Sequence, residues 1–142
     1  MPNDVAQAIM NFANLASTLE QQFRRFVNDF NNHAWDDLRV NVLDRNVLII
    51  GIDHPHIHHV SGIDDVIAFL RDSHGHFDSD APVFQVFGDN GYAIGVGYWT
   101  DDDDPNSPIL FSFIFINRAS PETPEWKAMR LWASRPLGDL KP

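Results

Sequence analysis

The residue types best suited to chemistry gather in residues 53–59. Asp53 is followed closely by His54, His56, His58 and His59. A carboxylate shielded from water has a raised pKa and acts as a general base near neutral pH, and imidazole exchanges protons in the same range. The segment therefore predicts proton transfer, with Asp53, His54, His56 and His58 as the candidate catalytic residues. The alternative is a solvated, pH-sensitive loop at the rim of a pocket.

The same histidines also suggest a metal site. If residues 54–58 are extended, His54, His56 and His58 project to one side of the chain. Three neutral imidazoles, or two together with Asp53, bind a divalent metal such as Zn²⁺. Pro55 interrupts the segment, and no His-x-x-x-His helix or glutamate partner accompanies it. Metal binding is therefore the less favoured hypothesis for this segment, and we expect no organic cofactor.

Periodic apolar residues define the elements that must hold this segment in place. Residues 4–30 form a long amphipathic helix, because apolar side chains recur at spacings of four and three. These side chains are Val5, Ile9, Phe12, Ala16, Leu19, Phe23, Phe26 and Phe30. A short helix follows over 35–43, then a strand at 47–50, a loop at 51–59 and a helix from 61 to about 71, capped by Ser61. Alternating patterns predict strands at 83–87, 92–100, 109–116 and 125–134, with the acidic run 101–104 at a solvated hairpin tip.

Length and composition limit the class of protein. The chain has 142 residues, the size of one domain, and 44% of them are hydrophobic. We expect a single domain over 1–142 with its core in 4–135 and a loose tail at 136–142. The net charge of −10 argues against a nucleic-acid or membrane partner, and the lack of cysteine excludes disulfides and thiolate sites. No apolar run is long enough to span a bilayer, so we expect a cytoplasmic protein.

Helices followed by a run of mainly antiparallel strands predict an α+β fold. The order resembles the nuclear transport factor 2-like superfamily, also called SnoaL-like, over about residues 8–135. Three motifs carry the resemblance: Phe26–Asn32 followed by Trp35 and Leu38, the segment Ser61–Leu70, and Glu125-Trp126-Lys127 with Ala133-Ser134. The resemblance implies a cone-shaped domain in which a curved sheet wraps the helices and leaves a pocket at the wide end.

The resemblance gives Asp53 its clearest role and also limits it. In ketosteroid isomerase, a member of this superfamily, a proton-shuttling Asp stands at the position that Asp53 matches here. The oxyanion hole of that enzyme needs a Tyr and a protonated Asp, whereas this chain aligns Phe26 and Ser112 there. This departure argues against steroid isomerase activity. The Arg flanked by two Asp of limonene epoxide hydrolase is not recognisable either.

The aromatic and strand residues supply the predicted binding surfaces. Pocket-lining residues are expected at Phe26, Phe30, Trp35, Trp99, Ser112 and Ile114. Residues 109–116 are apolar on both faces, so we expect one face to pack against the helices and the other, with Phe111, Phe113 and Phe115, to face outward. An exposed patch of this kind marks association, and the superfamily commonly dimerises through the outer sheet face. We therefore expect a homodimer and a small apolar ligand.

Three functions stay open at this point. The first is an isomerase, cyclase or dehydratase that acts on an apolar, carbonyl-bearing substrate through proton transfer by Asp53 and the histidines. The second is a ligand-binding or structural homodimer without catalysis. The third is a metal protein built on the histidine cluster. Fold does not choose among them, so whether the protein is an enzyme and what it binds depend on the site.

Overall fold

The computed structural model describes residues 2–53, 56–78, 83–87, 92–120 and 122–134. The helical elements are α1 (Pro2–Asn31), α2 (Trp35–Asp37), the wide turn η1 (Leu38–Val42) and α3 (Ile63–Arg71). The strands are β1 (Leu43–Asp53), β2 (His56–Ser61), β3 (Gly75–Phe77), β4 (Val83–Phe87), β5 (Tyr92–Asp101), β6 (Asp104–Asn117) and β7 (Trp126–Ser134). None of the helices so described is long and apolar enough to cross a membrane.

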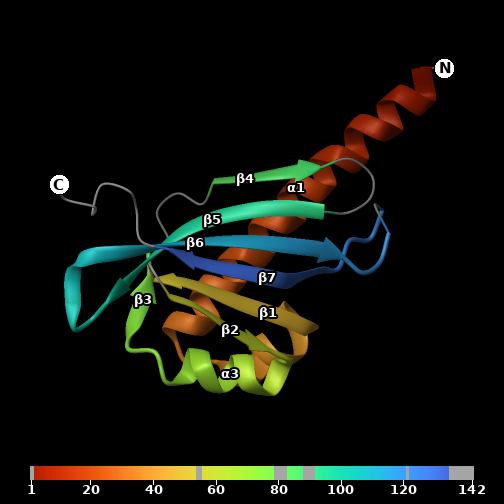
Figure 1. Ribbon diagram of the computed structural model, residues 1–142. Helices are drawn as coiled ribbons and strands as arrows, with labels where there is room; N and C mark the ends of the chain where they lie inside the picture. The colour runs from red at the N-terminus through yellow and green to blue at the C-terminus, as the bar shows by residue number, and fades with distance from the viewer. Residues whose placement is uncertain (1, 54–55, 79–82, 88–91, 121, 135–142) are drawn as a thin grey trace.

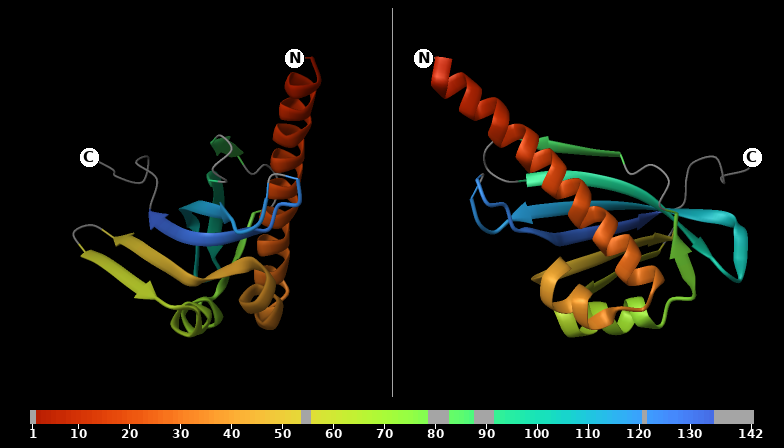
Figure 2. Two further views of the ribbon diagram at one scale, coloured as in Figure 1. Left: turned by 90° about the vertical axis from the view of Figure 1, so that its right-hand side faces the viewer. Right: turned by 180° about the vertical axis from the view of Figure 1, so that it is seen from behind.

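The strands form one mixed sheet in the order β2-β1-β7-β6-β5-β3, and β4 also pairs with β5. Only β1 and β7 run parallel among these pairs, and the others are antiparallel. The sheet is curved, α1 crosses one of its faces obliquely, and α3 lies beside β1 and β2 (Figures 1 and 2). This is the α+β architecture that the order of sequence patterns predicted.

The core lies between α1 and the sheet. Leu19, Phe23, Phe26 and Phe30 of the predicted helical stripe are almost fully buried. The rings of Phe23 and Phe26 pack edge-on against Phe113 of β6, with centroid distances of 5.1 Å and 4.9 Å. Burying one such side chain contributes roughly 1.5–3 kcal/mol, so this aromatic row holds α1 on the sheet.

The outward orientation expected for Phe111, Phe113 and Phe115 is wrong. All three are buried, and Phe113 and Phe115 contact Phe23 of α1. The alternation along β6 is confirmed, but a period of two defines two faces and does not identify the face that meets the helix. The large rings take the helix side because they remove the most apolar surface from water there. The homodimer stays a prediction, now without these three residues at its surface.

The same alternation corrects two pocket assignments. Ser112 and Ile114 stand between the buried phenylalanines on β6, so they lie on the opposite face of the sheet, where they are partly exposed. They therefore do not line a cavity on the helix side.

The first half of α1 extends beyond the sheet (Figures 1 and 2). The apolar stripe continues there, but Val5, Ile9 and Phe12 are 60%, 65% and 56% exposed. Continuous burial begins at Leu15. The sequence pattern thus predicted the helix correctly and overestimated how much of it is covered.

Residues 51–53 and 56–59 belong to strands, where a loop was expected. β1 continues to Asp53, and β2 pairs with it antiparallel, so that Asp53 lies opposite His56 and Gly51 lies opposite His58. His54 and Pro55 lie outside the described residues. The cap predicted at Ser61 is also wrong, because Ser61 ends β2 and Gly62 occupies the N-cap of α3 with a φ of 88°. Glycine tolerates that left-handed conformation without strain.

Candidate functional site

A hollow of about 360 Å³ opens at the end of the sheet where β3 and the β5–β6 hairpin lie. We call it the aromatic cavity. Its apolar wall comes from α1, α3 and four strands, and consists of Phe30, Phe69, Leu70, Phe77, Trp99, Ile109, Phe111 and Ala133. The volume lies within the range of small-molecule sites, which are concave, mostly apolar and rimmed by a few polar groups.

The wall is a set of rings that fix one another. Phe77 packs edge-on against Phe30 and Phe111, with centroid distances of 4.9 Å and 5.1 Å. Trp99 meets Phe111 at 6.4 Å. Phe30, Phe77, Trp99 and Phe111 are all buried, so the cavity is walled by rings with little freedom to move.

Phe77 owes its position to the end of α1. The side chain of Asn31 donates to the carbonyl of Phe77 at 3.0 Å and accepts from its backbone N–H at 2.8 Å. The two bonds satisfy both backbone polar groups of a residue near the edge of the sheet. They also fasten the short strand β3 to α1, which brings the ring of Phe77 into the cavity wall.

Trp99 depends in turn on a glycine. A Cβ atom built on Gly75 would overlap the ring of Trp99 and the carbonyl oxygen of Thr100. A side chain at position 75 would therefore push the indole away from β3. Gly75 is what allows β3 to lie against β5 at this point.

The mouth of the cavity is acidic. Asp72, Ser73 and His74 follow α3, and Asp101 and Asp103 flank the β5–β6 turn. No arginine or lysine is among the described residues that line the cavity. The site therefore combines an aromatic interior with a rim of carboxylates.

Backbone contacts hold this rim in place. The N–H of Asp102 donates to the carbonyl of His74 at 2.9 Å, and the N–H of Asp103 donates to Oδ1 of Asp101 at 2.8 Å. The loop after α3 and the hairpin turn are thus tied together across the mouth. The hairpin itself was predicted, whereas its place beside a cavity was not.

Of the six predicted pocket residues, Ser112 and Ile114 lie on the opposite face of the sheet, and the other four lie at or near the cavity. Phe30 and Trp99 line the cavity. Phe26 lies beneath it in the core, against Phe77 and Phe113, and Trp35 packs on Phe30 from outside, at 5.5 Å between ring centroids. Sequence reasoning missed Phe77 and the rim aspartates, because only the folded chain brings β3 and the acidic turn together.

The predicted catalytic segment begins two residues after a β1 residue that pairs with the cavity wall. Gly51 of β1 pairs with Ala133, which lines the cavity, and Asp53 follows two residues later at the end of the strand. The structure gives the backbone positions of Asp53, His56 and His58, while their side chains and all of His54 lie outside what it describes. The proton-transfer set and the metal set thus stay predictions. Among the residues that the structure describes, no group of three potential ligands is placed to hold a metal.

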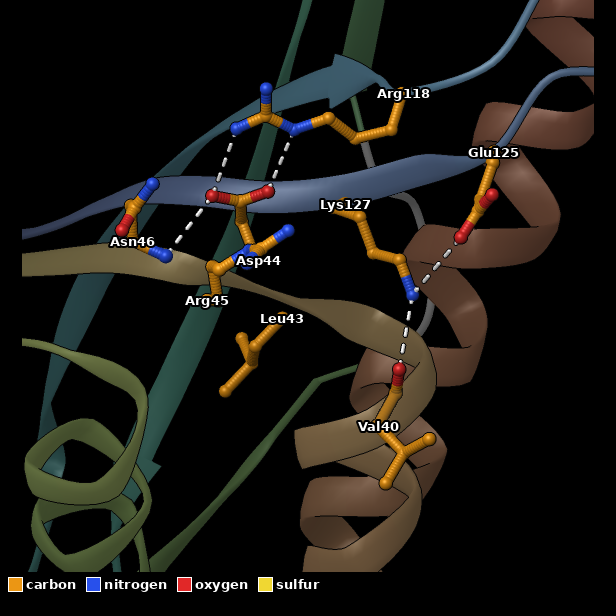
Figure 3. A pocket seen from close by; sticks show the side chains of 8 residues that line it. All are labelled: Val40, Leu43, Asp44, Arg45, Asn46, Arg118, Glu125 and Lys127. Atoms are coloured by element: carbon orange, nitrogen blue, oxygen red, sulfur yellow. Dashed lines mark hydrogen bonds and ion pairs between the residues drawn. The ribbon is translucent and has the colours of Figure 1, made fainter.

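A second hollow, of about 720 Å³, lies at the opposite end of the sheet, where β1 and β7 begin. We call it the polar hollow, and Figure 3 shows the eight residues that line it: Val40, Leu43, Asp44, Arg45, Asn46, Arg118, Glu125 and Lys127. The charged groups in it are largely paired with one another. Arg118 donates to both carboxylate oxygens of Asp44, at 2.8 Å and 3.0 Å.

Asp44 is 4% exposed, which makes it the buried charge of this hollow. Burial acts to raise the pKa of Asp44, but the guanidinium of Arg118 and the N–H of Asn46 outweigh it and hold that pKa below its ordinary value. Lys127 donates to the carbonyl of Val40 at 3.1 Å and lies 3.6 Å from Glu125. The polar hollow is therefore best explained as a paired structural network, and the aromatic cavity is the better candidate site.

A third polar cluster joins the end of α1 to α2. Arg25 donates to both oxygens of Asp37, at 2.8 Å and 2.6 Å, and Asn41 donates to Asp37 at 2.8 Å. These bonds lower the pKa of Asp37. Burial, together with the adjacent carboxyl group of Asp37, raises the pKa of Asp29 to about 7. Asp29 directly precedes Phe30 on α1 but is not among the residues that line the aromatic cavity.

Comparison with known proteins identifies the fold. No protein-family model and no curated protein matches the sequence. A nuclear transport factor 2-like protein from Pseudomonas putida KT2440 superposes with a TM-score of 0.64 at 13% identity, covering 89% of this chain and 95% of that one. A cystatin-like fold protein from Burkholderia xenovorans LB400 gives 0.62 at 12% identity, covering 85% and 91%. A candidate ketosteroid isomerase from Kribbella flavida gives 0.54 at 13% identity, covering 87% and 81%.

At such low identities the likeness concerns the fold alone. The chain has the nuclear transport factor 2-like, or cystatin-like, fold that the sequence motifs implied. Function has to be argued from the cavity itself.

Proposed function

We propose that the protein binds a small, largely apolar molecule in the aromatic cavity. The observation that carries this proposal is a hollow of about 360 Å³ walled by Phe30, Phe77, Trp99 and Phe111. Residues from α1, α3, β3, β5, β6 and β7 converge there, and the four rings are buried and pack against one another. A preformed apolar wall binds tightly because little ordering is required when the ligand enters.

A neutral aromatic probe tests this proposal. We expect 1-naphthalenemethanol to bind the protein saturably in a calorimetric titration. Ala133→Phe places a ring into the cavity from β7 and should abolish this binding, and Ala133→Leu should weaken it. Ala119→Phe is the matched control, because Ala119 is exposed in the loop after β6 and is not among the residues that line the cavity. Equal binding by the Ala133→Phe and Ala119→Phe variants would show that the probe sits elsewhere and would overturn the proposal.

Proton transfer at the same cavity is the second function that an observation favours. Asp53 ends β1 two residues beyond Gly51, and Gly51 pairs with the cavity residue Ala133. A general base there would abstract a proton from carbon next to the carbonyl group of a bound substrate. The candidate ketosteroid isomerase among the structures of similar fold is consistent with this chemistry.

Deuterium exchange tests the catalytic hypothesis without knowledge of the substrate. The ketone 2-tetralone has the shape of the naphthyl probe and carries exchangeable C–H groups next to its carbonyl. We expect the protein to accelerate its exchange in D₂O, and Asp53→Asn to reduce the acceleration about 10²-fold or more while ketone binding persists. Asp36→Asn, at an exposed position of α2, is the control. If Asp53→Asn leaves the exchange rate unchanged, the protein acts as a binding module.

A further inference from the structure

We propose that the preferred ligand of the aromatic cavity is an organic ammonium, a molecule with an apolar body and a positively charged nitrogen. The inference rests on the proposed function and names the class of ligand. It follows from the juxtaposition of two features: a wall of buried rings, and a mouth lined by Asp72, Asp101 and Asp103 with no lysine or arginine among the described lining residues.

The wall offers surface to both parts of such a ligand. Phe30, Phe77 and Phe111 are buried rings that cover an apolar body. Trp99 lies nearest the acidic turn, two residues before Asp101 on β5. An indole face is the best aromatic partner for a cation, because the ring quadrupole places negative charge on its face. A cation that leaves bulk water at this mouth therefore meets Trp99 and carboxylates together.

The carboxylate of Asp101 and the backbone of the β5–β6 turn are held at the rim by hydrogen bonds. Asp101 is only partly exposed, and its Oδ1 accepts the N–H of Asp103 at 2.8 Å. The bond from Asp102 N–H to the carbonyl of His74 fixes the turn against the loop after α3. Because the rim is ordered in advance, attraction to a cation costs little rearrangement. An anionic ligand would meet like charges at the same distance and would be rejected.

The chemistry of the wall separates an organic cation from a metal ion. Divalent ions require several oxygen or nitrogen ligands and hold their water strongly. No three such side chains are grouped to hold a metal in the described part of the chain. Aromatic rings cannot replace a metal's hydration shell, whereas they suit a weakly hydrated alkylammonium group. The net charge of −10 further favours the approach of cations from solution.

Three probes with one ring system test the inference. They are 1-naphthylmethylammonium, the neutral 1-naphthalenemethanol and the anionic 1-naphthoate, titrated calorimetrically at pH 7 and low salt. We expect the ammonium to bind about tenfold or more tightly than the alcohol, and the carboxylate to bind most weakly. The preference for the ammonium should shrink as salt is added, because partly exposed charges are screened.

Substitutions at the rim test whether its carboxylates cause the preference for the ammonium probe. The Asp101→Asn, Asp103→Asn double variant keeps the shape and the hydrogen-bond acceptor at position 101 but removes two charges. We expect it to reduce the preference to about two- to threefold while binding of the alcohol stays unchanged. The matched control is the Asp64→Asn, Asp65→Asn double variant, at exposed positions of α3 outside the cavity lining, which should retain the preference. Thermal melting confirms that each variant is folded.

The outcomes distinguish the inference from the function on which it rests. If the alcohol binds as tightly as the ammonium and Ala133→Phe abolishes both, the binding function stands and the ammonium preference is wrong. Competition with calcium chloride or tetramethylammonium chloride, at equal ionic strength, tests whether other cations displace 1-naphthylmethylammonium. If calcium displaces the probe as effectively as tetramethylammonium does, the mouth is a general cation site and the inference is overturned. If none of the three probes binds, the proposed function and the inference fail together.

Discussion

The ion pair between Asp44 and Arg118 is the residue-scale feature with the largest predicted effect on stability. The side chain of Asp44 is 5% exposed, and Arg118 holds both of its oxygens. Arg118→Ala would leave a buried carboxylate without its main partner, at a cost of about 2–4 kcal/mol in the free energy of unfolding. Urea denaturation measures this cost.

The comparison variant is Arg24→Ala, which breaks the exposed ion pair between Arg24 and Glu20. Exposed pairs of this kind contribute about 0–1 kcal/mol, so its unfolding curve should nearly match that of the wild type. Adding Asp44→Asn to Arg118→Ala should restore part of the loss, because the neutral amide is easier to bury. Equal effects of Arg118→Ala and Arg24→Ala would show that the burial of Asp44 has no energetic consequence.

Asp29 makes stability depend on pH in the neutral range. Its pKa is raised from 3.8 to about 7 in the folded protein, so between these values the folded state keeps a proton that the unfolded chain has lost. The free energy of unfolding should therefore fall as pH rises from about 4 to 7 and level off above 7. Since Asp29 is partly in contact with water, we expect a loss of about 1–2 kcal/mol.

Asp29→Asn removes the titrating group and should flatten this part of the profile. The free energy of unfolding of the variant should therefore rise relative to that of the wild type between pH 5 and pH 8. Asp36→Asn, on the neighbouring exposed carboxylate, should leave the profile as it is. Chemical denaturation at a series of pH values measures both. Parallel profiles for Asp29→Asn and the wild type would refute the prediction. The low pKa of Asp37 acts in the opposite sense and only below about pH 4, where protonation of its carboxylate costs stability.

At the scale of elements, α1 shows what a sequence pattern contains and what it lacks. The spacing of apolar residues predicted one long helix because it depends only on the geometry of that helix. The extent of burial depends on where the sheet ends, and the sheet ends before Phe12, which is 56% exposed. The side chains that bury α1 include Phe113 and Phe115, which are about ninety residues away in the sequence. A local pattern carries no information about that distance.

Because only the second half of α1 is buried, changes in its two halves should differ in their effect on stability. Deleting residues 2–11 removes a segment whose side chains are exposed over residues 4–10, and it should change the free energy of unfolding by less than about 1 kcal/mol. Phe26→Ala should cost about 3–5 kcal/mol, because Phe26 is fully buried against Phe77 and Phe113. Urea unfolding of the two variants measures the contrast. A large loss of stability on deletion would mean that the first turns of α1 are covered in solution.

The β6 strand and the pairing of β1 with β2 also depend on tertiary contacts. Alternation predicted two faces on β6 correctly, but the choice of face depends on contacts with α1. Pro55 and the polar histidines suggested a loop, yet residues 56–59 join a ladder because β1 offers them a partner strand. Tertiary context overrode the local signal in both places. The types of the elements were thus largely predictable, whereas the buried face of a strand and its pairing partner were not.

At the scale of the whole molecule, the candidate site could be predicted only in part. Phe30 and Trp99 were expected in a pocket, and both line it. Phe77 and the acidic rim belong to β3 and to a hairpin turn that meet only after the chain has folded, through Asn31 and the bond from Asp102 to His74. Sequence motifs implied that a pocket exists because they implied the fold. The chemistry of the pocket required the positions of side chains from six elements.

An open cavity also lowers the stability of the whole molecule. Apolar wall atoms that face a hollow lack the packing partners they would have in a filled core. Ala133→Leu adds apolar volume from β7 at a partly exposed position and should raise the free energy of unfolding by about 0.5–2 kcal/mol while it weakens binding of 1-naphthalenemethanol. Ala119→Leu in the exposed loop should change neither quantity appreciably. Urea denaturation and calorimetric titration of the same samples give both values. A gain in stability coupled to a loss of binding would indicate that the hollow is retained for its ligand, whereas a loss of both would mean that leucine strains the surrounding rings and that the wall is already closely packed.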